Sequence, residues 1–175
     1  MTQGFDEAQE RRNWLERLGE KIPGFKGFQD RTLRRDVDKL QREHLAQEVS
    51  RLKVGVRGKA RAYTDVGQIG LLHIFDRLDR KLDGLAQSIR FADYGTSGIF
   101  DVVKFREEEL DKLYQFDLSL LDDLSQLSGD LSVVPLPGQG DARDALEQTL
   151  GRLELMEEKW AGRKNVISEV VKTSS

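Results

Sequence analysis

The sequence contains no cysteine. This absence excludes disulfide bonds, thiolate metal sites and a cysteine nucleophile together. Histidine is also scarce, since His44 and His73 are the only two in the chain. Neither follows a glutamate by three residues, the spacing that places the ligands of a di-metal site in a helical bundle. The sequence therefore predicts no metal, no cofactor and no catalytic histidine.

Long apolar runs are missing as well. No window approaches the roughly 18 apolar residues of a membrane-spanning helix, and the first ten residues lack the basic and apolar regions of a secretion signal. We therefore expect a cytoplasmic protein, with the inner face of the membrane as a second location. Phosphate-binding loops ending in Gly-Lys-Ser/Thr and Gly-x-Ser-x-Gly nucleophile turns are also absent. These absences predict that the protein is not an enzyme.

What the chain does contain is hydrophobic residues at steps of three and four, the pattern of amphipathic helices. The clearest seam follows a heptad spacing through Leu71, Phe75, Leu78, Leu82, Leu85 and Ile89. Five helical segments are predicted, at about 6–21, 31–56, 71–89, 110–127 and 142–170. Because glycine is unfavourable inside a helix, Gly55 and Gly58 are expected to kink or break the second segment, with a boundary near Thr64 and Asp65.

This pattern predicts an all-α fold, an elongated antiparallel helical bundle or stacked helical hairpins of about five helices with coiled-coil-like seams. The 175 residues suffice for a single domain. We expect a bundle core over residues 1–130 and a proline- and glycine-rich linker over 131–140. The C-terminal helix of residues 141–175 is expected to start after Asp141 as its cap and to pack on the same domain.

Two connectors combine glycine with aromatic residues. The first, residues 22–28, carries Phe25 and Phe28, and the second, residues 92–100, carries Tyr94 and Phe100. We expect these rings to fill the ends of the bundle, because burying a large aromatic side chain stabilises by about 1.5–3 kcal/mol. The alternative is that Phe25 and Phe28, beside basic residues, form a shallow anchor on an anionic membrane surface.

Charge is distributed unevenly along the chain. Residues 1–64 carry fifteen Lys and Arg against ten Asp and Glu, whereas residues 65–175 carry thirteen against twenty-one. Acidic residues are interleaved with the cations of the second helix, so nucleic-acid binding is not expected. We expect instead that the basic second helix, which includes Arg34 and Arg35, meets the acidic fourth helix within one chain or across a dimer. Asp117 is the expected buried acid, paired with an arginine of the second helix.

Four stretches carry a resemblance to known sequences. They are Ile-Pro-Gly-Phe-Lys-Gly-Phe at 22–28, Arg-Thr-Leu-Arg-Arg-Asp-Val-Asp-Lys-Leu at 31–40, Ala-Asp-Tyr-Gly at 92–95 and Glu-Leu-Asp-Lys-Leu-Tyr-Gln-Phe-Asp at 109–117. Over about residues 20–125 the chain resembles an uncharacterised family of bacterial helical proteins. The resemblance implies no activity and no catalytic residue. Such proteins accompany membrane-scaffold proteins of the flotillin-like class, which implies an accessory or scaffolding role.

The sequence as a whole predicts a non-catalytic interaction or scaffolding protein that works through helix–helix contacts and complementary charged faces. A protein partner or self-association is expected. The first alternative is a peripheral membrane-associated protein that uses Phe25 and Phe28. The second is a helical enzyme based on carboxylates, which would require Asp101, Asp117 and His73 to converge on one pocket.

Overall fold

The computed structural model describes residues 19–20, 31–92 and 107–173, and the side chains of 31–38, 107–111 and 168–173 lie outside that description. The described elements are α2 (Arg31–Asp65), the 3-10 turn η1 (Ile69–Leu71), α3 (Leu72–Arg90), α5 (Glu107–Val133) and α6 (Arg143–Thr173). No strand occurs among these residues, which confirms the all-α class. Of the first predicted helix, only Gly19 and Glu20 are described, and both are helical and exposed.

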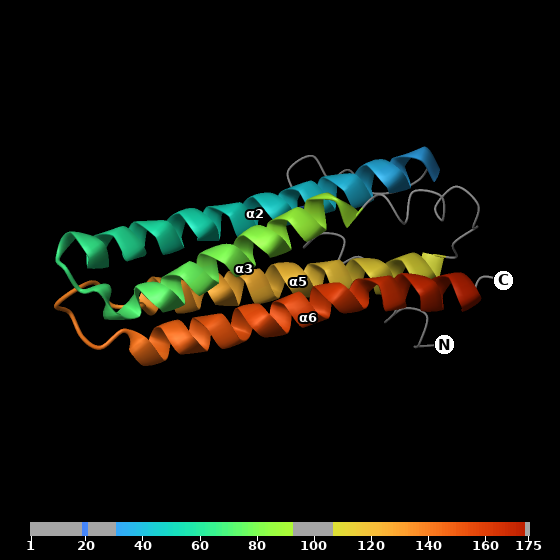
Figure 1. The fold of residues 1–175 in the computed structure, drawn as a ribbon. Coiled ribbons are helices and arrows are strands. Elements are labelled where there is room, and N and C mark those ends of the chain that lie inside the picture. Colours follow the sequence, from blue (N-terminus) through green and yellow to red (C-terminus); the bar gives the residue numbers. More distant parts are fainter. Residues whose placement is uncertain (1–18, 21–30, 93–106, 174–175) are drawn as a thin grey trace.

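The four long helices form two antiparallel hairpins that lie side by side (Figure 1). The first hairpin is α2 with α3, the second is α5 with α6, and these two pairings are the most extensive of the fold. The hairpins meet where α3 packs on α6 and α2 packs on α5. Arg77 contacts Glu154 and Lys81 contacts Glu157, so α3 and α6 run in the same direction. The α2–α5 contact is the less extensive of the two.

The second helix does not break at its glycines, as the sequence analysis expected. α2 continues without interruption for 35 residues through Gly55 and Gly58. Each glycine costs about 1 kcal/mol relative to alanine, but α2 buries apolar side chains before and after both of them, at Leu52, Val56 and Tyr63. Packing along the whole helix therefore outweighs the local preference.

α2 ends where the sequence placed its boundary, next to Asp65. The main-chain N–H of Gly67 donates to the carbonyl of Thr64, and the N–H of Gln68 donates to the carbonyl of Tyr63. This is the hydrogen-bond pattern of a Schellman motif. Gly67 has a φ of 73°, a conformation that glycine adopts without the strain of a side chain.

The fourth predicted helix is longer than expected. α5 extends to Val133, because Leu131 and then Val134 still reach the core. The connection to α6 therefore spans residues 134–142 instead of the predicted 131–140, and it contains Pro135 and Pro137. α6 begins at Arg143, whose N–H donates to Asp141 Oδ1 over 2.9 Å, so Asp141 caps this helix as expected.

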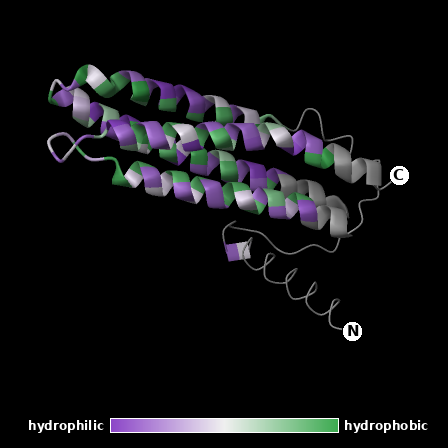
Figure 2. Cartoon of the chain, turned by 90° about the horizontal axis from the view of Figure 1, so that it is seen from below, coloured by the Kyte–Doolittle hydropathy of each residue, from purple (hydrophilic) through white to green (hydrophobic). Residues whose placement is uncertain are grey.

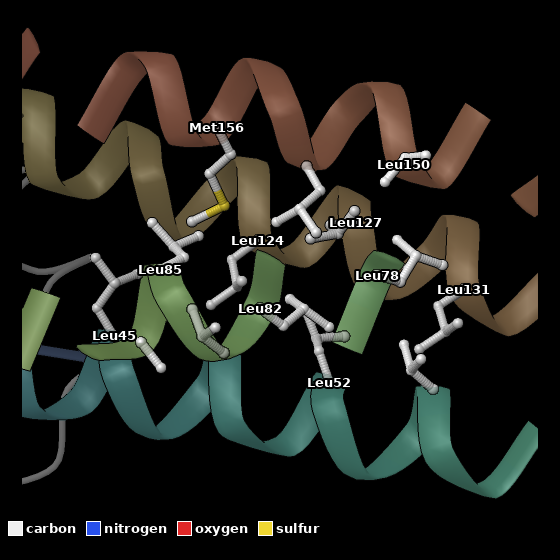
Figure 3. Packing of buried hydrophobic residues seen from close by; sticks show 14 of the residues in the cluster. Leu45, Leu52, Leu78, Leu82, Leu85, Leu124, Leu127, Leu131, Leu150 and Met156 are labelled. Atoms are coloured by element: carbon white, nitrogen blue, oxygen red, sulfur yellow. The ribbon is translucent and has the colours of Figure 1, made fainter. Parts of the chain in front are cut away.

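All four helices contribute to one hydrophobic core. Hydrophobic and hydrophilic residues recur around each helix at helical spacing (Figure 2), and the labelled side chains converge between the helices (Figure 3). The heptad seam of α3 is confirmed, because five of its six residues are buried: Phe75, Leu78, Leu82, Leu85 and Ile89. Leu45 and Leu52 face them from α2, and α5 and α6 complete the core with Leu124, Leu127, Leu131, Leu146, Leu150, Leu153 and Met156.

Candidate functional site

Most residues that the sequence singled out are not placed by the structure. Phe25, Phe28, Tyr94 and Phe100 lie outside the described residues. Arg34 and Arg35 belong to α2, but their side chains are likewise outside the description. The expected packing or exposure of these residues therefore stays a prediction.

Asp117 is described, and it is buried as predicted, with 6% of its surface exposed. Its two carboxylate oxygens accept hydrogen bonds from Nε and Nη2 of Arg163, each over 2.8 Å. The guanidinium of Arg163 also lies 5.3 Å from the ring centre of Trp160, which is a cation–π distance. This partner corrects the expected one: Arg163 belongs to α6, the helix against which α5 packs most closely, and not to α2.

The predicted second and fourth helices do meet, as α2 and α5, but the described ion pairs do not join them. The cross-helix ion pairs described for α2 go to α3, where Lys53 contacts Asp83 and Arg57 contacts Asp79. Those described for α5 go to α6, through the pairs Lys159–Asp123, Arg152–Asp130 and Arg163–Asp117. Most of the described cross-helix ion pairs thus lie within a hairpin, while Arg77 and Lys81 of α3 join the two hairpins through Glu154 and Glu157 of α6.

An open groove of about 790 Å³ lies between α2 and α5, where the helices pack less extensively. Its apolar residues are Leu52, Leu121, Leu124 and Leu131. Its polar and small residues are His44, Glu48, Arg51, Gly55 and Lys59 on α2, and Ser125, Ser128 and Ser132 on α5. The small serine side chains of α5 leave the space open. The sequence patterns did not predict this groove, although the three serines on one face of α5 are a signal that could have indicated it.

The two walls of the groove differ in charge. The α5 wall presents serine hydroxyls, whereas the α2 wall carries Arg51, which pairs with Glu48 one turn earlier. Lys59 Nζ donates to the carbonyl oxygen of Val134 over 2.5 Å, at the end of the groove next to the α5–α6 connection. Burial lowers the pKa of His44, more strongly than the negative charge of Glu48 raises it. The groove therefore combines a leucine floor with one neutral wall and one wall that contains cations.

A second feature lies where the two hairpin turns meet. The hydroxyl of Tyr63 donates to the carbonyl oxygen of Pro135 over 3.0 Å and so joins α2 to the α5–α6 connection. Burial, followed by the charge of Asp141, raises the pKa of Tyr63. Four apolar side chains remain exposed around these turns: Val66, Ile69, Val133 and Leu136.

One further interior residue is chemically unusual. The Gln41 side chain is buried in α2, and among the residues that the structure describes neither its amide nitrogen nor its amide oxygen has a hydrogen-bond partner. Its neighbour Arg42 is also buried, and Arg42 Nη1 lies 3.5 Å from the carbonyl oxygen of Arg90 at the end of α3. An unpaired buried amide destabilises a fold. This residue is therefore a specific target for mutation.

The carboxylate-based enzyme finds little support in this geometry. His73 is exposed on the first turn of α3, whereas Asp117 is buried and bonded to Arg163 between α5 and α6, and Asp101 lies outside the described residues. Within the described ranges, no three His, Asp or Glu side chains are grouped so that they could hold a metal ion. None of the described helices is long and apolar enough to cross a membrane. No family model, curated protein sequence or solved structure matches this chain significantly.

Proposed function

We propose that this protein is a non-catalytic interaction module that binds an amphipathic helix in the groove between α2 and α5. The observation that carries the proposal is the open, leucine-floored form of this groove. Leu52 and Leu121 are the most exposed leucines of the buried core, at 8% each, and both lie in the groove. A partner helix would cover them and remove their remaining apolar surface from water.

The dimensions suit such a ligand. On α2 the groove extends from His44 to Lys59, which is about 22 Å at about 1.5 Å per residue, or four turns of an incoming helix. The small serine side chains of α5 allow a partner backbone to approach closely. Because Arg51 pairs with Glu48, the cation that favours a carboxylate on a partner helix is Lys59, at the end of the groove next to the α5–α6 connection.

The architecture and cellular role that we propose follow from this binding mode. The predicted helix over residues 6–21 would complete a five-helix, elongated bundle, and helix–helix contacts would support scaffolding or self-association in the cytoplasm. Peripheral membrane binding through Phe25 and Phe28 is a second proposal, supported by the basic residues near them in the sequence. Exposure of both rings in solution would favour it.

The helix-binding proposal is tested by filling the groove. Ser128 is an exposed groove residue of α5, and Gln148 is an exposed residue of α6 that does not line the groove. Tagged wild type, Ser128→Trp and Gln148→Trp are used for affinity capture from native lysate, after circular dichroism and thermal melting show that both variants fold. A partner retained by wild type and Gln148→Trp but lost with Ser128→Trp is expected. Equal retention by both variants would contradict the proposal.

A further inference from the structure

The chain carries one open apolar groove and a second apolar surface that the sequence predicts. One is the α2–α5 groove. The other is the predicted helix of residues 6–21, whose apolar positions include Leu15, Leu18 and the adjoining Ile22. Gly19 falls between them on the same face, and in the structure it is helical and exposed. Both surfaces therefore have apolar area to bury.

We propose that residues 6–21 dock into the α2–α5 groove of the same chain, as a helix antiparallel to α2, and thereby compete with partner helices. This inference rests on the proposed helix-binding function of the groove. A helix over residues 6–21 is about 24 Å long, against about 22 Å for the groove between His44 and Lys59. The segment thus matches the groove in length.

The connection to α2 selects the direction of docking. In the antiparallel arrangement the end of the segment lies beside His44, which is about 20 Å along α2 from Arg31. Residues 22–30 span up to about 30 Å when extended, so they reach this point. A parallel arrangement would place the end of the segment beside Lys59, about 42 Å from Arg31, which is beyond their reach.

The charges support the same direction. When residue 21 lies beside His44, Arg17 lies beside Glu48, and Asp6 lies beside Lys59 at the other end of the groove. Opposite charges therefore meet at both ends. In the reverse direction the acidic start of the segment would lie beside Glu48 instead. Because the segment belongs to the same chain, its effective concentration at the groove reaches the millimolar range expected for short linkers.

The absence of cysteine makes a direct test possible, since any introduced pair is unique in the chain. Arg12→Cys flanks the apolar face of the segment and is combined with Ser128→Cys in the groove. The control combines Arg12→Cys with Gln148→Cys on α6. A short bismaleimide should cross-link the first pair within one chain at least about tenfold faster than the control pair. Equal rates, or cross-links that form only between two chains, would overturn the docking within one chain.

A second measurement separates this inference from the proposed function. A solvent-sensitive fluorophore on Ser128→Cys reports binding of a synthetic peptide of residues 5–22 to the full-length protein. The peptide should bind several-fold more tightly when the chain also carries Leu15→Asp and Leu18→Asp. In that variant, residues 6–21 of the chain no longer compete with the peptide for the groove. Equal binding to both proteins would show that the groove accepts helices but is not covered by this segment. That result would overturn the inference and leave the proposed function in place. Binding to neither protein would also overturn it, and the Ser128→Trp capture would then decide the proposed function.

Discussion

Asp117 and Arg163 form a two-point ion pair inside the bundle, with both of the hydrogen bonds at 2.8 Å. Their side chains are 8% and 4% exposed, which makes this the most buried of the described ion pairs. Two planar groups held in this way allow only one alignment of α5 with α6. A charge pair in a leucine-rich core thus selects the pairing of helices, even though removing two charges from water is costly.

Asp117→Asn is expected to destabilise the protein by about 3–5 kcal/mol, because the substitution leaves the Arg163 charge buried without its carboxylate. Asp76→Asn on the exposed side of α3 is the matched control and should change stability by less than about 1 kcal/mol. Urea unfolding followed by circular dichroism measures both. Similar, small effects of the two substitutions would show that the Asp117–Arg163 pair does not stabilise the core.

Replacing both partners should cost much less than replacing one. Asp117→Leu combined with Arg163→Met removes both charges and both desolvation costs, so its stability should lie within about 1 kcal/mol of wild type or above it. A double variant as unstable as Asp117→Asn would mean that further groups in the core depend on these charges.

Gln41→Leu is expected to stabilise the fold. The Gln41 amide is buried without a hydrogen-bond partner in the described part of the chain, and removing such a group recovers about 1–3 kcal/mol of desolvation free energy. Gln47→Leu, on the exposed face of the same helix, should stay within about 0.5 kcal/mol of wild type. Urea unfolding of both variants tests this, and a loss of stability in Gln41→Leu would refute it.

The two glycines of α2 should respond differently to alanine. A Cβ at Gly58 meets no atom within 4 Å, so Gly58→Ala should stabilise the protein by up to about 1 kcal/mol through helix propensity. A Cβ at Gly55 would lie 3.1 Å from Leu131 Cδ2, so that Leu131 must shift. Gly55→Ala should therefore be less stable than Gly58→Ala in thermal unfolding. If Gly55→Ala were the more stable of the two variants, Leu131 would have shifted without a cost in free energy.

His44 makes the free energy of unfolding depend on pH, and the direction of its pKa shift sets the direction of that dependence. Burial lowers its pKa from the ordinary 6.5, so the unfolded chain takes up the proton first as the pH falls. The stability that neutral His44 contributes to the folded state is complete above pH 6.5. It is lost as the pH falls through the lowered pKa of the folded state. The free energy of unfolding should therefore decrease more between about pH 7.5 and 5.5 in wild type than in His44→Gln, by at most about 1.4 kcal/mol per pH unit. Identical slopes would contradict this.

The errors of the sequence-based predictions have physical causes. Gly55 and Gly58 predicted a break because each is unfavourable locally, but the burial of Leu52 and Val56 beside them keeps α2 continuous. Charge composition predicted that the second and fourth helices would pair through their charges, but it does not specify which face of a helix bears each charge. Lys53 and Arg57 lie on the α3 side of α2, where Asp83 and Asp79 are available. The groove was missed because it results from two helices together.

The sequence by itself determined the helical class, the end of α2 near Asp65, the heptad seam of α3 and the burial of Asp117. These features depend on the spacing of residues within one segment, which the sequence states directly. Only the tertiary structure decided that Asp117 pairs with Arg163 and that an open groove separates α2 from α5. Periodicity tells which face of a helix is buried, but it does not tell which helix covers that face. That choice depends on the lengths of the turns and on the fit of whole helix surfaces, both of which act between segments far apart in the chain.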